Sequence, residues 1–211
     1  ISDSSGALLF YSNGMTVWNK NHQVMLNGTN LLGHETSTQS AIIVPKPLNT
    51  DIYYIFTVTN RGSNNGVKFS EVDMTLDGGL GEVTVKNTDL PQSANAEERI
   101  TSVKGDACNT FWVITGDRNE FQAYLVDKDG VNTNAKTSSY AVTNLNDSRG
   151  YLKVSPDGSK LISAYSTGGT FLYDFNDADG TISNGRSINV TGELGYGVEF
   201  SRNSQKLYIS T

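Results

Sequence analysis

Few residues of the types that usually carry out chemistry occur in this sequence. It has two histidines, His22 in the Asn- and Lys-rich stretch 19–23 and His34 in the loop "GHETSTQS", and one cysteine, Cys108. Histidine is the commonest transition-metal ligand and acid–base group. Neither histidine has a partner at H-x-x-x-H or C-x-x-C spacing, and Cys108 has no basic neighbour in sequence that would stabilise a thiolate. We therefore expect both histidines to be exposed or packed in loops, and Cys108 to be structural.

A pair of carboxylates could serve as acid and base. Glu71 and Asp73 alternate in "VKFSEVD" (67–73), which we expect to be a strand, so both side chains point to one face of it. The same phrase is also typical of a plain strand, and we prefer that interpretation. No catalytic residue is assigned from the sequence.

A calcium loop is the weaker of two interpretations of "DFNDADGTIS" (174–183). Such loops place oxygen ligands at alternate positions and add a distal Glu. Counted from Asp174, the third site is Ala178, and the next Glu along the chain is Glu193. We interpret the segment as an ordinary turn, and we assign no metal-binding or cofactor-binding residue.

The aromatic residues are the remaining candidates for binding a ligand. Most fall at alternating strand positions and should fill interfaces between sheets, where each buries a large area. They are Tyr11, Trp18, Tyr53, Tyr54, Phe111, Trp112, Tyr151, Tyr165, Tyr173, Tyr196 and Tyr208. Tyr151 and Tyr196 hold equivalent places, each in a "GY" at the start of an expected strand, where a sugar- or peptide-binding rim could form. The ligand-binding residues stay unknown.

Composition narrows the class of protein that positions these residues. The chain has 211 residues, of which 36% are hydrophobic, 18% are charged and 21 are glycine, as in turn-rich β proteins. A net charge of −6 with scattered basic residues argues against nucleic acid as a partner. No apolar run is long enough to span a membrane. The opening "ISDSSG" has no basic region of a signal peptide, and we expect that the natural start lies before it.

An internal repeat of about 45–60 residues organises the chain, which is the range of four-stranded propeller blades. The expected first strands are 39–45, 99–105, 150–156 and 195–201; the second are 51–58, 110–116, 160–166 and 206–211; the third are 67–73, 121–127 and 170–175; the fourth are 78–87, 129–136 and 179–186. Radial stacking of such sheets buries both faces of each one. The sequence therefore predicts an all-β fold, a β-propeller fragment over residues 1–211 built of four-stranded antiparallel blades. Three blades are complete (about 39–95, 98–143 and 148–191) and two are partial (1–33 and 195–211).

A tight turn joins the first two strands of each blade. In "SPDG" (155–158), Pro156 presets φ at the first central position, and Gly158 is free to take a positive φ. In the equivalent "SRNSQ" (201–205) we expect Asn203 to be the left-handed residue.

Longer phrases of the chain carry a family resemblance. "GALLFYSNGMTVWNKNHQVMLNGTNLLG", "FSEVDMTLDGGLGEV", "GYLKVSPDGSKL" and "GYGVEFSRNSQKLYIS" resemble the β-propeller region of large Bacteroidetes surface proteins that carry a gliding-motility-associated C-terminal domain. That resemblance implies export by the type IX secretion system, with its machinery and outer-membrane components as partners, and an extracellular or cell-surface location. It also implies β-sandwich modules and a sorting domain beyond residue 211. It implies no catalytic motif and no cofactor.

Three functions are compatible with this sequence. The first is a non-catalytic binding and display module for adhesion, gliding or the binding of a surface polysaccharide or protein, because stiff propellers present recognition loops. The alternative is a propeller enzyme of the lactonase or quinoprotein type with its active site at the central channel. A third is that the chain acts only as export cargo of its secretion machinery. Because catalytic side chains are scarce, the sequence favours the first, and so predicts that the protein is not an enzyme.

Overall fold

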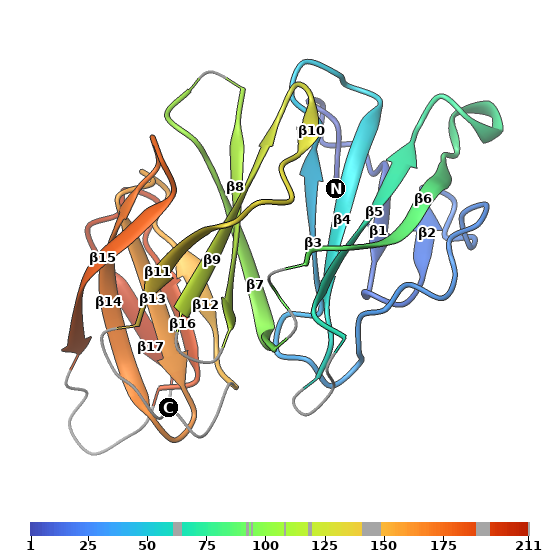
Figure 1. Ribbon diagram of the computed structural model, residues 1–211. Coiled ribbons are helices and arrows are strands. Elements are labelled where there is room, and N and C mark those ends of the chain that lie inside the picture. The colour runs from blue at the N-terminus through green and yellow to red at the C-terminus, as the bar shows by residue number, and fades with distance from the viewer. Residues whose placement is uncertain are drawn as a thin grey trace.

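The computed structural model describes residues 1–60, 65–91, 93, 95–107, 109–117, 120–140, 149–188 and 195–210. Within these residues the fold is all β apart from the short 3-10 helix η1 (Asp77–Gly79). In Figure 1 the three larger sheets follow one another in chain order across the view, from the cyan-to-green sheet through the yellow-green one to the orange one. No helix in this part of the chain has the length and apolar character needed to cross a membrane.

Each sheet is antiparallel, and consecutive strands are neighbours except at one end of the second sheet, where the last two strands both pair with the third. The first complete sheet holds β3 (Ala41–Pro45), β4 (Ile52–Val58), β5 (Val67–Asp73) and β6 (Glu82–Asp89). The second holds β7 (Ala96–Lys104), β8 (Phe111–Asp117), β9 (Glu120–Asp127), β10 (Gly130–Val131) and β11 (Lys136–Ser139); the third holds β12 (Leu152–Val154), β13 (Lys160–Tyr165), β14 (Gly169–Asn176) and β15 (Thr181–Ile188). Two-stranded sheets flank them, β1 (Phe10–Ser12) with β2 (Val17–Asn19), and β16 (Gly197–Phe200) with β17 (Leu207–Ser210).

The cores lie between successive sheets. Six of the seven residues of β4, "IYYIFTV", are buried, whereas most of β15, "TISNGRSI", is not. A second strand that is apolar on both faces is covered by neighbouring sheets on both sides, and a polar fourth strand can form an outer edge. One buried cluster joins residues of the first and second sheets, among them Phe56 and Tyr124, and another joins the second and third, among them Phe121 and Tyr173. These stacked antiparallel sheets confirm the prediction of an all-β fold and agree with a propeller-like class, whereas a closed propeller stays a prediction.

The first strands of successive sheets contact one another. β3 packs against β7, β7 against β12, and β12 against β16. Each of these strands therefore begins beside the start of the next, although the residues concerned are far apart in the sequence. This arrangement positions the candidate site.

The turn between β12 and β13 has the predicted form. Gly158 has φ 73°, and its N–H donates to the carbonyl oxygen of Ser155 at 2.9 Å. The Asp157 carboxylate accepts the Ser155 hydroxyl at 2.6 Å and the backbone N–H of Ser159 at 3.1 Å. Hydrogen bonds from both serines, led by that of Ser155, lower the pKa of Asp157. The turn is thus held by its own side chains.

Two local predictions are wrong. In "SRNSQ" the left-handed residue is Ser204 (φ 59°), because the Asn203 side chain instead accepts the Ser201 hydroxyl at 2.8 Å and closes the turn. The segment 129–136 is not one strand but β10 and β11. Between them the Asn132 side chain accepts the backbone N–H of Asn134 at 3.0 Å, an Asx turn that competes with the ladder.

Candidate functional site

The segments that lead into β3, β7, β12 and β16 are joined by hydrogen bonds. The Gln39 backbone N–H donates to the Glu98 carbonyl oxygen at 3.1 Å, and the Gln39 side-chain oxygen accepts the Leu152 N–H at 3.0 Å. The Tyr151 N–H donates to the Tyr196 carbonyl oxygen at 2.9 Å. Side chains from four successive sheets therefore meet where the first strands begin.

Three side chains at this place form a chain of hydrogen bonds, which we call the hydroxyl relay. The Thr38 hydroxyl donates to Glu98 Oε1 at 2.9 Å and lies 3.0 Å from the Tyr196 hydroxyl. Threonine has one hydroxyl proton, and an ionised carboxylate only accepts. Since the Thr38 proton goes to Glu98, the Tyr196 hydroxyl is the donor to Thr38. The relay runs from Tyr196 through Thr38 to Glu98.

Exposure rises along the hydroxyl relay. Glu98 is only 3% exposed, Thr38 is half-buried, and Tyr196 is 41% exposed. A buried carboxylate is thus connected to a hydroxyl that solvent or a ligand can reach. A carboxylate can act as a general base through intervening hydrogen-bonded groups.

Glu98 occupies a β-bulge. In the pairing of β7 with β8, Ala96 lies opposite Asp117 and Ile100 lies opposite Thr115. Residues 97–99 therefore face Gly116 alone. Bulges re-aim side chains and are frequent beside active sites. This one places Glu97 and Arg99 in the interface with the third sheet, while Glu98 reaches Thr38.

Arg99 is fully buried and connects the second and third sheets. Its Nε donates to Glu97 Oε2 at 2.7 Å, and another of its nitrogens donates to the Ala164 carbonyl oxygen at 2.6 Å. The guanidinium also lies 4.0 Å from the centre of the Tyr165 ring. Burial alone would lower the pKa of Arg99, but Glu97, Tyr165 and Tyr140 together outweigh it, so the pKa is raised and the group stays charged.

The glycine of each "GY" pair allows a close approach between strands. A Cβ on Gly150, which has φ 123°, would lie 2.4 Å from the Ala164 carbonyl oxygen. A Cβ on Gly195 would lie 2.6 Å from an atom of Ile209. The two tyrosines that follow these glycines pack edge to face, with ring centres 6.1 Å apart. Tyr151 and Tyr196, candidates from the sequence, are therefore brought together.

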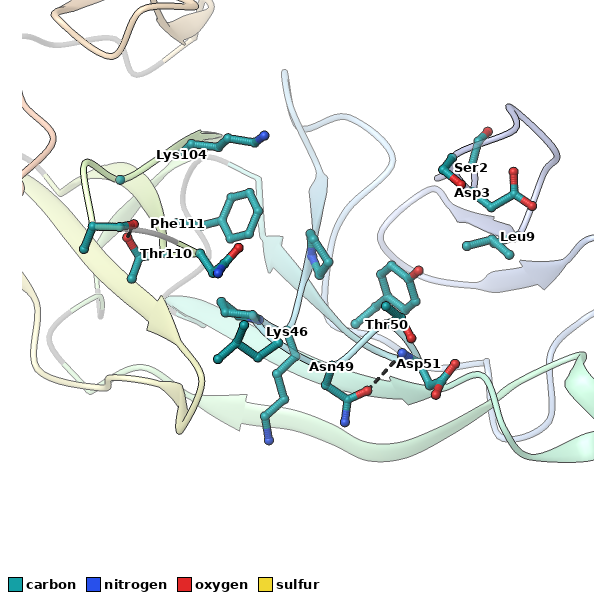
Figure 2. A pocket seen from close by; sticks show the side chains of 18 residues that line it. Ser2, Asp3, Leu9, Lys46, Asn49, Thr50, Asp51, Lys104, Thr110 and Phe111 are labelled. Carbon is teal, nitrogen blue, oxygen red and sulfur yellow. Dashed lines mark hydrogen bonds between the residues drawn. The ribbon is translucent and has the colours of Figure 1, made fainter.

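A groove lies at the opposite ends of the first strands. Its volume is about 940 Å³, and it is lined by the N-terminal segment and by the turns that follow β3 and β7. Figure 2 shows Lys46 and Lys104 extending in different directions, and a dashed line marks the backbone N–H of Asp51 donating to Asn49 Oδ1 at 2.9 Å. Asn49 thus serves its own turn. The groove is large enough for a ligand, but its described lining residues form no chain of side-chain hydrogen bonds like the hydroxyl relay.

The structure does not bring the two histidines together with the hydroxyl relay. His22 lies in the turn after β2, with Nδ1 3.3 Å from the Tyr11 hydroxyl. His34 Nδ1 accepts the backbone N–H of Thr36 at 3.1 Å. Both serve local turns, as expected from the sequence. Cys108 lies outside the described residues.

The predicted carboxylates also have local partners. Glu71 accepts the Thr84 hydroxyl at 3.0 Å, and Asp73 accepts the backbone N–H of Thr75 at 2.8 Å. Asp174 accepts Lys160 Nζ at 2.8 Å. Among the described residues no three His, Cys, Asp or Glu side chains are grouped so that they could hold a metal ion. Glu193, invoked for a calcium loop, lies outside those residues.

Sequence reasoning missed Glu98 and Thr38. The phrase "AEER" (96–99) ends at the position that the repeat aligns with Gly150, and two acids beside an arginine at the start of a buried strand are unusual. The expected strand began at residue 99, whereas β7 begins at Ala96. Both acids therefore fall just outside the strand that the sequence predicts.

Comparisons with known proteins give a fold but no family. No family model matches the chain, and no curated protein matches it. The chain is similar to the crystal structure of a candidate 6-phosphogluconolactonase from Bacteroides uniformis, with a TM-score of 0.53 and 14% identity over 95% of this chain and 62% of that one. A second, from Bacteroides fragilis, has a TM-score of 0.47 and 10% identity over 99% of this chain and 75% of that one. The chain thus spans about 62% of the first structure's length, and the first likeness supports a propeller-like fold.

These findings correct the predicted function. The solved structure with a similar fold bears the name of a lactonase, which contradicts the non-catalytic binding and display module and the prediction that the protein is not an enzyme. The alternative, a propeller enzyme of the lactonase type, is the better supported. The resemblance to gliding-motility proteins, export by the type IX system and the surface location stay predictions, as does the absence of a cofactor.

Proposed function

We propose that the chain is part of a propeller enzyme of the lactonase type, which hydrolyses the cyclic ester of a sugar acid at the hydroxyl relay. The first strands β3, β7, β12 and β16 would line the central channel of a closed propeller, with the relay at the mouth of that channel. The observation that carries the proposal is the chain of hydrogen bonds from exposed Tyr196 through Thr38 to buried Glu98. The fold shared with a candidate 6-phosphogluconolactonase supports the reaction class.

The chemistry requires a base for water. A water molecule at Tyr196 attacks the lactone carbonyl carbon and gives its proton to the Tyr196 oxygen, while Tyr196 passes its own proton to Thr38 and Thr38 passes one to Glu98. The ester bond to the ring oxygen then breaks. The proton held by Glu98 returns along the relay to the leaving oxygen, so the carboxylate is restored and an open-chain hydroxy acid is released. General base catalysis of this kind contributes roughly 10²–10⁴-fold in rate.

The test is hydrolysis of δ-lactones by the protein in its natural length. Glucono-δ-lactone and its 6-phosphate would each be followed by acid release with a pH indicator, against the spontaneous rate. Glu98→Gln and Tyr196→Phe should each lower kcat by about 10²-fold or more, because each interrupts the relay.

A matched control is Tyr208→Phe, which removes the hydroxyl of another exposed tyrosine, on β17. It should leave kcat unchanged. Hydrolysis no faster than the spontaneous rate for both lactones, or full activity in Glu98→Gln, would refute the proposal.

A further inference from the structure

The buried ion pair of Glu97 and Arg99 flanks Glu98 on both sides in sequence. Arg99 is completely inaccessible to solvent and the Glu97 side chain is 5% exposed, with their charged atoms 2.5 Å apart at the closest. Removing two charges from water is costly, and such pairs are often replaceable by apolar residues without loss of stability. A contribution to stability is therefore a weak explanation for this one.

The contacts of Arg99 close a ring around the site. Arg99 donates to the Ala164 carbonyl oxygen at 2.6 Å, and the Ala164 N–H donates to the Tyr151 carbonyl oxygen at 3.0 Å. The Tyr151 N–H in turn donates to the Tyr196 carbonyl oxygen at 2.9 Å. The Tyr196 hydroxyl then returns through Thr38 to Glu98, which is the residue before Arg99.

Both ends of the hydroxyl relay are therefore tied to one guanidinium. One end of the relay, Glu98, lies in the bulge. The hydrogen bond between Arg99 and Glu97 holds residues 97–99 together opposite Gly116. The other end depends on Arg99 through β13, because the Ala164 N–H donates to the Tyr151 carbonyl oxygen and the Tyr151 N–H donates to that of Tyr196. The planar fork of Arg can serve two acceptors in fixed directions, which a lysine ammonium cannot.

We infer that the Glu97–Arg99 pair is a positioning device, which holds the Glu98 carboxylate within hydrogen-bonding distance of Thr38 and in line with Tyr196. Its catalytic consequence rests on the proposed function, since it sets the geometry of the base in that reaction. Neither Glu97 nor Arg99 contacts substrate. Small displacements of a catalytic group cost rate out of proportion to their size.

The test is the double variant Glu97→Gln/Arg99→Met, which removes both charges together while keeping similar side-chain volumes. Because no charge is left unpaired, the melting temperature should stay within a few degrees of the wild type. The kcat for lactone hydrolysis should fall by about 10–100-fold, with KM changed less than about threefold. A crystal structure of the variant should show Thr38 Oγ1 and Glu98 Oε1 no longer within hydrogen-bonding distance, against 2.9 Å in the wild type.

A second variant guards against a double variant that does not fold. Arg99→Lys keeps a positive charge beside Glu97 but loses the fork that also reaches Ala164, so kcat should again fall while KM changes little. The matched control is Lys153→Met/Glu199→Gln. It removes an exposed ion pair, 3.1 Å long, that also joins the first strands of neighbouring sheets, and it should change neither kcat nor the Thr38–Glu98 distance.

The outcomes separate the two proposals. A wild-type protein without lactonase activity refutes the proposed function, yet the Thr38–Glu98 distance in the variants still decides the positioning role. A folded double variant that keeps this distance overturns the inference whatever the activity. Unchanged kcat in a folded double variant of an active enzyme overturns it as well.

Discussion

Replacing Gly116 by alanine tests the fit of the bulge at its tightest point. A Cβ on Gly116 would lie 2.0 Å from the Tyr140 hydroxyl oxygen and 2.3 Å from Glu97 Oε2. Both atoms belong to buried residues, and burial raises the pKa of Tyr140 well above its usual value. The new methyl group must therefore displace the Tyr140 hydroxyl and the Glu97 carboxylate, which disturbs the ion pair of Glu97 with Arg99.

The loss of unfolding free energy in Gly116→Ala depends on which groups the methyl group displaces. Overpacking a core typically costs about 1–3 kcal/mol, and uncoupling a buried ion pair costs about 3–5 kcal/mol. Since the two effects share the displacement of Glu97, we expect Gly116→Ala to lose about 3–5 kcal/mol of unfolding free energy. At about 2–4 °C per kcal/mol for a chain of this size, the melting temperature should fall by roughly 6–20 °C. Urea unfolding followed by circular dichroism measures the unfolding free energy, and thermal scans measure the melting temperature.

A matched glycine is available on β16. In Gly197→Ala the nearest atom to the new Cβ is the Ser210 hydroxyl oxygen at 2.6 Å, the end of a side chain that can rotate away, and the next is at 3.8 Å. This variant should lose less than about 1 kcal/mol. Equal stabilities of the two variants would show that the bulge is not tightly packed around Glu97.

Two further predictions concern stability. Trp112→Phe removes the indole N–H that donates to the Asp177 carbonyl oxygen at 2.7 Å, so we expect a loss of about 1–3 kcal/mol in urea unfolding, and a loss below about 0.5 kcal/mol would contradict it. A hydrogen bond from Lys160 lowers the pKa of Asp174 from 3.8 to about 2. A pKa lowered in the folded state gives stability that is present above the unfolded pKa and is lost as the pH falls through the folded value, so the urea midpoint should decline between pH 3.8 and about 2. Asp174→Asn should flatten that decline, and an unaltered pH profile would show that this carboxylate is not linked to folding.

The strands were predictable from the sequence where local chemistry sets them. The strand expected at 67–73 is β5 with the same bounds, because alternating apolar residues between two turns leave one register. Gly158 was identified as a turn residue for a reason that holds in the structure, its positive φ. The turn at Asn203 failed because two adjacent polar residues could each supply the bend, and side-chain hydrogen bonds decided between them.

The site was not predictable in the same way, because its parts are joined only in three dimensions. Thr38 and Tyr196 lie on segments whose meeting depends on the packing of β3 against β7 and of β12 against β16. Glu98 reaches Thr38 because of a register shift opposite Gly116, and among the described pairings of first with second strands this shift is found only in β7–β8, so no repeat period reveals it. The prediction that the protein is not an enzyme depended on the scarcity of histidine and cysteine. That reasoning assumes that a catalytic site needs one of these two residue types. Carboxylate and hydroxyl side chains are common in any sequence. What distinguishes these three is that they form one chain of hydrogen bonds, along which exposure rises from 3% at Glu98 to 41% at Tyr196. The proposed base is therefore placed by one irregularity of the repeat, the bulge at residues 97–99, and not by a sequence motif.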